Sequence, residues 1–540
     1  SNNISNASVE GYSINIDGSL NNSEYKVSPN VPLKEKQDIQ KLNNFIQETS
    51  STMSSNVKDI FPSLINDEEV VLDKLSIPNL SSRLLIAETE SNPKTSLNMF
   101  SKASSKSNSE QSETIHNPEK TQQYLLFCLN SLGNYVSMEG HKTTILYFII
   151  SSLRLINKLD NNLIKTAKSF ITERAVFEDK KLIGFRGGNF TPFCCSKSSC
   201  EQRNSNDLPH LASTYCAFNL LYSLDVNLLC PEQFNSLFAN VSIGNNNKKE
   251  KELVSFDIER LFSEIAKLQN HDGSVNCMEG GDQENDSRFV YCALSVKRII
   301  RLMNDQHIQS ISNKLCSCSL PKNKSLYSSS YLDMIPFLND KLTYKYLTSV
   351  QSYEGGFAMT PQGESNSGIS FCSVASIILL NKEIPSAELL LKWLLSRINS
   401  SGVNGRVNKV ADSCYSFWVI GNLINIVNYY NRSKCSVNSK TLNTICHFKN
   451  GEDLSIEDLI EFSSTEKFLA SCYHTKYNAF CKHSLQRVIE GKPDILHTFY
   501  SLCTLSILKK RNSSNTDTEG KKEKKGSERS QLDTLLVTVK

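Results

Sequence analysis

Three residues of this chain carry side chains that could together bind a metal ion: Asp412, Cys414 and His497. Asp412 and Cys414 lie two residues apart at the expected start of a helix, and His497 opens a later predicted helix. Carboxylate, thiolate and imidazole are all zinc ligands, and three protein ligands leave a fourth position open, as in catalytic zinc sites. The positive end of the helix would also lower the pKa of the Cys414 thiol. A capping Asp and a His at a helix start also occur without any metal, so the pattern by itself leaves a purely structural interpretation open.

The elements that must position these residues are predicted to be helices. Five segments begin with polar residues and continue with apolar and small residues at helical spacing: His210–Leu224, Arg288–Met303, Ser370–Leu380, Asp412–Ile426 and His497–Leu508. Almost no strand-like alternation separates them, which favours an all-α domain. Two of the helices follow a Gln and a glycine turn, at residues 269–273 and 351–355, which is typical of helical hairpin repeats that stack to bury their apolar faces.

The remaining segments look like additions to one domain over residues 119–510. Residues 1–118 are rich in Ser and Asn and are predicted to be mostly disordered. Similar stretches at about 305–330 and 432–465 are predicted insertions. Residues 511–540 are predicted to be a disordered, lysine-rich tail.

Composition excludes several classes of protein. The net charge of +3 is too small to indicate a nucleic-acid partner or an anionic membrane surface. No apolar run approaches the roughly 20 residues that span a bilayer, so we expect no integral membrane segment. The 17 cysteines are scattered through helix-like segments, unlike a short disulfide framework. A reduced protein of the cytoplasm is therefore expected.

Four motifs identify a family. The segment GRVNKVADSCYSFW at 405–418 closely resembles the motif G-R-x-N-K-x-x-D-x-C-Y-S-F-W of protein prenyltransferase β subunits, and DILHTFYSL at 494–502 resembles the D-x-x-H segment of that family. ENDSRFVYCA at 284–293 and PHLASTY at 209–215 also have counterparts there. The resemblance covers roughly residues 120–510, with the motifs in the same order. It implies an α/α toroid, a barrel of six helical hairpins whose inner helices face a central cavity.

The resemblance also implies roles for individual residues. Asp412, Cys414 and His497 would bind one Zn²⁺, and a substrate cysteine would attack C1 of an isoprenoid diphosphate. Residues expected to contact the isoprenoid diphosphate are Arg406, Lys409, Tyr415, Asn366, Arg288, Trp418, Thr144, Phe148, Tyr215 and Tyr291. Among them, Arg406, Lys409 and Tyr415 would stabilise the departing diphosphate and count with the zinc ligands as catalytic. The peptide substrate would contact His210, Phe289 and Leu496. Each aromatic residue, taken singly, is equally compatible with ordinary core packing.

Local details favour the type I geranylgeranyl enzyme within this family. GFRG at 184–187 and the segment 284–292 look like the geranylgeranyl versions, and Thr144 stands where the farnesyl enzyme has a Trp that closes the tunnel. Lys482 and Arg487 occupy a stretch where the farnesyl enzyme has an Asp that supports Mg²⁺, so Mg²⁺ is not expected to be required. The implied partners are a prenyltransferase α subunit in a heterodimer, geranylgeranyl diphosphate, and proteins with a C-terminal CaaX motif such as small GTPases.

Two alternatives stay open. A farnesyl or dual-donor β subunit differs only in donor choice. A non-catalytic prenyltransferase-like scaffold is the other, because Asn366 stands where the family has a diphosphate-binding His. A toroidal terpene cyclase would need an Asp-rich acid motif, which we do not find.

Overall fold

A computed structural model describes residues 115–134, 136–188, 208–239, 254–280, 284–313, 329–432, 455–484, 491–516 and 532–540. All of them belong to one compact unit, Ser105–Lys540. Of the residues 1–118 that the sequence predicts to be mostly disordered, residues 1–114 lie outside these ranges. Within them, no helix combines the length and the apolar character needed to cross a bilayer.

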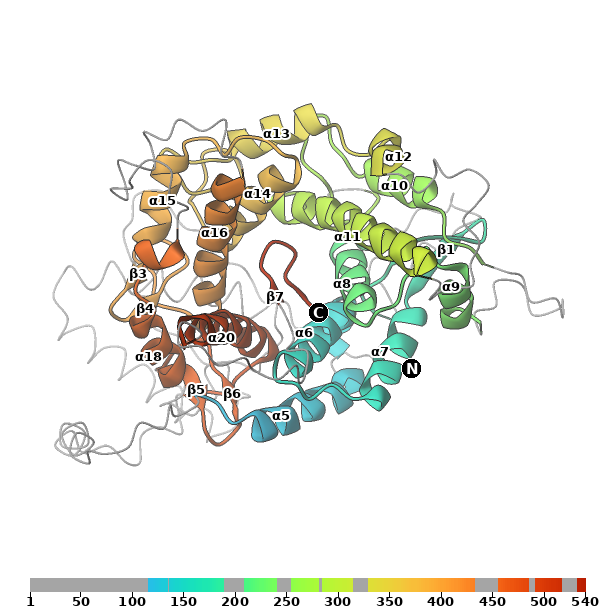
Figure 1. The fold of residues 1–540 in the computed structure, drawn as a ribbon. Helices are drawn as coiled ribbons and strands as arrows, with labels where there is room; N and C mark the ends of the chain where they lie inside the picture. Colours follow the sequence, from blue (N-terminus) through green and yellow to red (C-terminus); the bar gives the residue numbers. More distant parts are fainter. Residues whose placement is uncertain are drawn as a thin grey trace, which may run out of the picture. The chain divides into compact units, whose positions relative to one another are not determined.

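Six helices of this unit form a closed ring (Figure 1). In ring order they are α6 (Lys142–Leu155), α8 (Leu211–Ser223), α11 (Ser287–Ser312), α14 (Ser367–Leu379), α16 (Ser413–Arg432) and α20 (Ile495–Thr516). Each packs along the next, and α20 packs against α6. The ring confirms the predicted all-α toroid and contains all five helices predicted from sequence.

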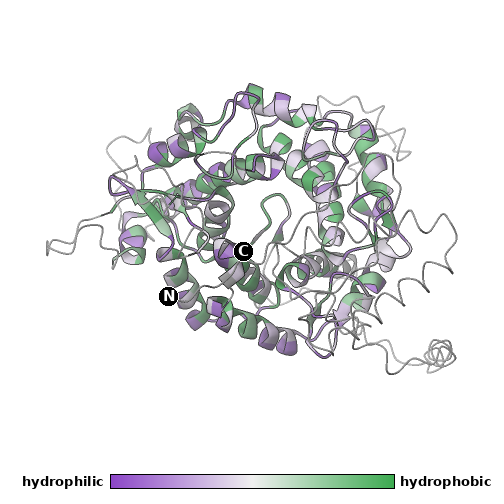
Figure 2. Cartoon of the chain, turned by 180° about the vertical axis from the view of Figure 1, so that it is seen from behind, coloured by the Kyte–Doolittle hydropathy of each residue, from purple (hydrophilic) through white to green (hydrophobic). Residues whose placement is uncertain are grey.

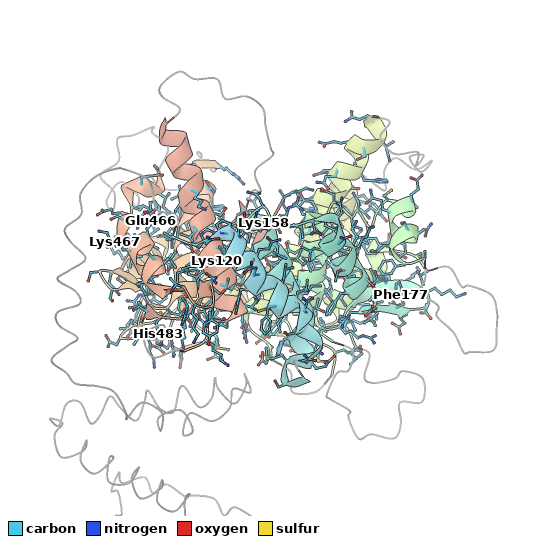
Figure 3. The ribbon with its side chains drawn as sticks, turned by 90° about the horizontal axis from the view of Figure 1, so that it is seen from below. Lys120, Lys158, Phe177, Glu466, Lys467 and His483 are labelled. Carbon is cyan, nitrogen blue, oxygen red and sulfur yellow. The ribbon has the colours of Figure 1, made fainter. Side chains whose placement is uncertain are left out.

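A second set of helices lies outside the ring: α5 (Pro118–Asn130), α7 (Asn161–Thr172), α9 (Pro231–Leu237), α10 (Ile258–Ala266), α12 (Ser329–Met334), α13 (Asp340–Ser349), α15 (Ala387–Leu395) and α18 (Ser463–Cys472). Composition explains the two layers. Inner helices such as α14 are buried on nearly every side, whereas outer helices bury one stripe only, as α10 does with Leu261, Phe262 and Ile265. Figure 2 shows the apolar colour along the inner helices, and in Figure 3 charged side chains such as Lys120 and Lys467 lie on outer helices.

Strands are short and form hairpins between or after helices. β1 (Ala175–Glu178) pairs antiparallel with β2 (Lys181–Phe185), with Ala175 opposite Phe185. Two-residue pairs follow: β3 (Ile398–Asn399) with β4 (Gly402–Val403), β5 (Tyr473–His474) with β6 (Ala479–Phe480), and β7 (Leu532–Asp533) with β8 (Thr538–Val539). Single 3₁₀ turns are η2 (Leu132–Asn134), η3 (Val136–His141) and η5 (Ile456–Asp458).

The two predicted insertions differ in part from what the structure shows. Helix α11 continues to Ser312 through the first part of the predicted insertion 305–330, of which residues 314–328 lie outside the described ranges. In the segment 432–465, residues 433–454 lie outside them, and η5 and the first turn of α18 occupy the rest.

The predicted disordered tail is wrong for part of the segment 511–540. Helix α20 runs to Thr516, and residues 532–540 form the β7–β8 hairpin in the middle of the ring (Figure 1). The reason is compositional. Lysines and other polar residues dominate the earlier part of this segment, but the end of the sequence reads LLVTVK, and its apolar side chains find a buried place. Residues 517–531 lie outside the described ranges.

Candidate active site

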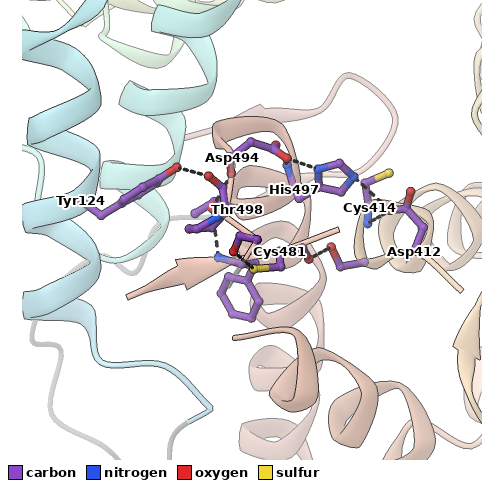
Figure 4. A network of polar contacts seen from close by, with 11 residues as sticks. Tyr124, Asp412, Cys414, Cys481, Asp494, His497 and Thr498 are labelled. Atoms are coloured by element: carbon purple, nitrogen blue, oxygen red, sulfur yellow. Dashed lines mark hydrogen bonds and ion pairs between the residues drawn. The ribbon is translucent and has the colours of Figure 1, made fainter. Parts of the chain in front are cut away.

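Asp412, Cys414 and His497 meet at the starts of two neighbouring inner helices, α16 and α20 (Figure 4). One ligand atom from each residue lies within 4.8 Å of the others. The Nε2 atom of His497 is 3.2 Å from Oδ1 of Asp412. The structure thus brings together all three residues that the sequence predicts as metal ligands.

Helix capping explains how the chain holds these residues. Asp412 precedes the first residue of α16, and its Oδ1 accepts a hydrogen bond from the backbone N–H of Cys414 at 3.0 Å. Asp494 does the same for α20, accepting from the N–H of His497 at 2.9 Å. Carboxylates at this position satisfy N–H groups that have no partner within the helix, and they favour the positive helix end. Local sequence therefore fixes both ligand-bearing turns.

Longer contacts hold the two helix starts in place. Ser413 donates from its backbone N–H to the carbonyl of Lys482 at 2.7 Å and from its hydroxyl to that of Cys481 at 2.8 Å. On the α20 side, Tyr124 of α5 donates to the carbonyl of Pro493 at 3.2 Å. The site is therefore anchored to outer elements on both sides (Figure 4).

Asp494 is a functional residue that the sequence argument missed, although it stands inside the motif at 494–502. Its Oδ2 lies 2.6 Å from Nδ1 of His497, so a carboxylate holds the ring nitrogen that faces away from Asp412. A histidine that binds a metal commonly donates its other N–H to such a carboxylate, which fixes the tautomer and the ring orientation. The Asp-x-x-His spacing, one helical turn, was the available signal.

The electrostatics of the cluster correct one prediction. Burial, and then the charge of Asp412, raises the pKa of Cys414 to about 12, so the helix end alone does not favour the thiolate as predicted. Burial disfavours the charged form of Asp412, but His497 outweighs it and keeps the pKa of Asp412 below its ordinary value. Burial likewise opposes charge on His497, yet Asp494 and Asp412 raise its pKa well above the ordinary value. Asp494 and Asp412 therefore favour positive charge at His497.

A zinc ion fits this set of donors. Nitrogen, sulfur and oxygen are all zinc ligands, and tetrahedral ligand atoms about 2.0–2.3 Å from one ion lie about 3.3–3.8 Å apart. The His497–Asp412 separation of 3.2 Å is close to this spacing, and all three ligand atoms lie within 4.8 Å of one another. The Nε2 atom of His497 is also buried and makes no well-aligned hydrogen bond, which leaves it available to a metal.

Replacing Asp494 by Asn should weaken zinc binding about 10- to 100-fold, because the amide retains the helix cap but loses the charge that orients His497. Zinc affinity measured by competition with a chelating dye checks this. Asp340→Asn, the same change in the first turn of the outer helix α13, is the control and should leave the affinity unchanged. Equal zinc affinity in the Asp494 variant and the unmodified chain would contradict the assigned role.

A cationic loop leads into the metal cluster. Residues 404–411 form a loop closed by a bridge between Asn404 and Ala411, and it carries Arg406 and Lys409. Nη1 of Arg406 pairs with Oε2 of Glu364 at 2.9 Å. The carbonyl of Gly405 accepts the backbone N–H of Ser367 at 2.9 Å, so the loop is attached to the start of α14.

Tyr415 and Asn366 lie beside this loop. The side-chain amide of Asn366 donates to the hydroxyl of Tyr415 at 3.1 Å, while its oxygen caps α14 by accepting from the N–H of Gly368 at 2.8 Å. Burial raises the pKa of Tyr415 well above its ordinary value, so the hydroxyl keeps its proton and can donate a hydrogen bond. Two cations, a phenol and the N-termini of α14 and α16 make this an anion-binding arrangement.

Gly405→Ala should lower the transferase activity that the sequence resemblance implies while leaving zinc bound, because an added Cβ would lie 2.1 Å from Cζ of Tyr415. The ring must then move, and the hydroxyl moves with it; we expect a fall in kcat of about tenfold or more, since misplacing one donor to a developing charge costs at least that much. Steady-state kinetics with a zinc assay checks it. Gly133→Ala, where the added Cβ meets nothing within 4 Å, is the control. Unchanged kinetics at position 405 would remove Tyr415 from the anion site.

An aromatic belt lines the ring below the metal cluster. Its members, one or two from every inner helix, are Tyr147, Phe148, Tyr215, Tyr291, Phe371, Trp418 and Tyr500. Successive ring centroids around this circuit are 4.3–6.2 Å apart. Because these residues stand at the fifth to seventh position of their helices, the six helix N-termini lie at one end of the ring. The sequence predicted four of them and missed Tyr147, Phe371 and Tyr500, although Tyr500 stands inside the motif at 494–502.

Comparison with known proteins assigns this chain to a family. The sequence profile of the family described as "Prenyltransferase alpha-alpha toroid domain" matches residues 117–522. The chain belongs to this family.

Two relatives of this prenyltransferase chain are named geranylgeranyl transferase type-1 subunit beta. The one from Arabidopsis thaliana is 26% identical over 398 residues, covering 70% of this chain and 81% of the relative. The one from Dictyostelium discoideum is 26% identical over 412 residues, covering 72% and 90%. The protein farnesyltransferase subunit beta of Arabidopsis thaliana is 25% identical over 304 residues, covering 56% and 47%.

The residues carried over from the prenyltransferase family lie at the same end of the ring as the metal cluster or within the belt. Arg288, near the start of α11, is held by Asp286, with Nη2 2.6 Å from Oδ2, and by Glu284 at 3.2 Å. These two carboxylates therefore already balance the charge of Arg288. Its predicted contact with the isoprenoid diphosphate stays a prediction. Thr144 is half-buried and accepts a hydrogen bond from Sγ of Cys216 at 3.7 Å.

The predicted peptide contacts fall in two places. His210 occupies the N-cap position of α8 without a capping hydrogen bond from its side chain. Its ring lies 6.1 Å from that of Phe289, and burial lowers the pKa of His210 to about 4. Leu496 is partly exposed beside His497. Of the two basic residues predicted to replace Mg²⁺, Lys482 lies close enough to Asp412 to lower the pKa of that carboxyl, and Arg487 lies outside the described ranges.

Proposed function

We propose that this chain is the catalytic β subunit of a protein geranylgeranyltransferase type I. The observation that carries the proposal is the junction of three features at one end of the ring: the Asp412, Cys414 and His497 cluster, the cationic loop with Tyr415, and the aromatic belt beneath them. A thiol, an anionic leaving group and an apolar chain can be held there together. The names of the two β-subunit relatives support the geranylgeranyl donor and a partner α subunit.

The chain's residues divide the reaction among them. Asp412, Cys414 and His497 would hold a zinc ion, which when bound lowers the pKa of a coordinated substrate thiol. The substrate thiol loses its proton, its sulfur bonds to C1 of geranylgeranyl diphosphate, the C1–O bond breaks and diphosphate leaves. Negative charge grows on the diphosphate in the transition state.

Arg406, Lys409 and the protonated Tyr415 hydroxyl stabilise that charge, with Arg406 exchanging its partner Glu364 for diphosphate oxygens. The aromatic belt receives the isoprenoid and excludes water. Asn366 donates a hydrogen bond to Tyr415, so it would position that hydroxyl where the family has a histidine.

We further propose that the protein acts in the cytoplasm, on CaaX-motif proteins such as small GTPases and without Mg²⁺. The cysteines among the described residues are free and buried, which suits a reducing compartment. Lys482 beside Asp412 supplies positive charge near the diphosphate end.

The test is transfer to a Cys-a-a-Leu peptide by the chain co-expressed with a prenyltransferase α subunit. We expect kcat/KM at least about tenfold higher with geranylgeranyl diphosphate than with farnesyl diphosphate, because the longer donor buries more apolar surface in the belt. Preference for farnesyl diphosphate would support the farnesyl alternative. A folded, zinc-bound heterodimer with no transfer would support the non-catalytic scaffold.

A further inference from the structure

The β7–β8 hairpin lies where the proposed lipid donor must go. Hydroxyls of three belt tyrosines donate to its backbone: Tyr215 to the carbonyl of Leu536 at 2.8 Å, Tyr291 to that of Leu535 at 2.9 Å, and Tyr147 to that of Val537. Tyr215 and Tyr291 are residues expected to line the isoprenoid tunnel. The tip of the hairpin therefore uses the same side chains as the donor.

Side-chain contacts fix the hairpin along its length. Thr534 and Asn425 of α16 exchange two hydrogen bonds, with Oγ1 of Thr534 donating to Oδ1 at 2.8 Å and Nδ2 of Asn425 donating to the Thr534 carbonyl at 3.3 Å. Thr538 bonds to Asn219 in the middle of α8. Nζ of Lys540 lies 3.2 Å from Oδ1 of Asp225, just beyond the end of α8.

These contacts give the depth of the hairpin. Lys540 pairs with Asp225 just beyond the C-terminal end of α8, and the tip reaches the side chains of the fifth or sixth residue of α6, α8 and α11, about one and a half turns from the starts of these helices. The hairpin touches α6, α8, α11, α16 and α20. It thus reaches from the C-terminal end of α8 up to the aromatic belt, and Figures 1 and 2 show it in the middle of the ring.

The hairpin resembles an apolar ligand in its burial. Leu536 is 1% exposed, Val537 2% and Val539 1%. A 20-carbon chain whose diphosphate lies at the helix N-termini is longer than the depth left above Tyr215 and Tyr291, because one and a half helical turns span only about 8 Å. Donor and hairpin cannot occupy the centre of the ring together.

Backbone strain at the tip indicates that the ring imposes this conformation. Val537 has a φ of 53°. A β-branched residue rarely adopts this left-handed region and does so only where surrounding contacts dictate it. Leaving the ring releases that strain.

We propose that residues Leu532–Lys540 are an autoinhibitory plug that competes with the isoprenoid diphosphate for the aromatic belt. The inference rests on the proposed function, since the donor is the competitor. The plug keeps the apolar ring filled until a lipid diphosphate displaces it, and it sets the donor concentration at which the enzyme starts to work.

The test compares the heterodimer carrying the full chain with one whose β chain ends at Gln531. The dissociation constant for geranylgeranyl diphosphate is measured by equilibrium binding, with zinc content and melting temperature as measures of folding. Truncation should lower the dissociation constant about tenfold, because a plug seated in nine molecules of ten weakens the apparent affinity by that factor. Adding donor to the full-length form should also speed amide hydrogen exchange of residues 535–538.

A point variant keeps the test valid if truncation disturbs folding. Leu536→Asp places a charge in the apolar centre and should tighten donor binding as truncation does, whereas Leu389→Asp, the same change at an exposed position of α15, should not. Equal or weaker donor binding in both plug variants, or amides 535–538 that stay protected with donor bound, would overturn the plug. If no form binds the donor despite bound zinc, the proposed function fails and the competition with it.

Discussion

Cys414→Ala should abolish stoichiometric zinc binding and lower kcat/KM for prenyl transfer about a thousandfold or more. The sulfur is one of three donors within 4.8 Å of one another, and the remaining pair, Asp412 and His497, would pair with each other instead of holding an ion. A bound metal contributes several kcal/mol of charge stabilisation, and each 1.36 kcal/mol is about tenfold in rate. Metal analysis of the purified heterodimer and transfer to a Cys-a-a-Leu peptide measure the two effects.

Cys503→Ala is the matched control for this variant. Cys503 is fully buried on α20, about two turns beyond His497, so the same atoms are removed from the same ring without touching the metal cluster. We expect this control to keep its zinc and to retain most activity, with a modest loss of stability from the small cavity. Equal loss of zinc in both variants would mean that Cys414 acts through packing and would remove it from the proposed ligands.

Thr144→Trp should reverse the donor preference. Thr144 is half-buried at the third position of α6, where its hydroxyl meets Cys216 of α8 just above the aromatic belt. An indole there fills space that a 20-carbon chain needs and a 15-carbon chain does not. Since even one methylene in an apolar pocket changes kcat/KM by about 10- to 200-fold, we expect geranylgeranyl transfer to fall about 100-fold and farnesyl transfer to be largely retained.

Thr144→Val separates size from polarity. It preserves the volume and removes only the hydroxyl that accepts from Cys216, so the donor preference should stay as in the unmodified enzyme. Competition kinetics with both diphosphates in one reaction give the ratio directly. If Thr144→Trp lowers transfer from both donors by the same factor, position 144 does not measure chain length, and the donor is selected elsewhere in the ring.

The plug and the donor preference meet in the same part of the ring. Tyr215 and Tyr291, which bind the hairpin through their hydroxyls, belong to the belt that the isoprenoid would contact through its apolar surface. A donor with more carbons displaces more of the hairpin and gains more burial in exchange. Donor selectivity of the full-length chain is therefore expected to depend on the hairpin as well as on Thr144.

The sequence alone determined the features that depend on neighbours in the chain. The five apolar segments became inner helices, and Asp412 and Cys414 lie together because an N-cap and the second helical residue are always close. His497 was a candidate because it opens a later predicted helix, and the resemblance of its motif to that of a known family strengthened the assignment. The physical reason for this success is that caps, turns and helical periodicity are encoded within a few residues.

Tertiary structure decided what depends on the closed ring. The aromatic belt exists only when α20 meets α6, and Asp494 acquires its role only when His497 faces Asp412 across two helices. The pKa of Cys414 is raised and not lowered as expected, because the surrounding core desolvates the thiol and the charge of Asp412 lies beside it. The last residues of the sequence read as a tail, but the ring offers its apolar side chains a buried surface that no local pattern reveals.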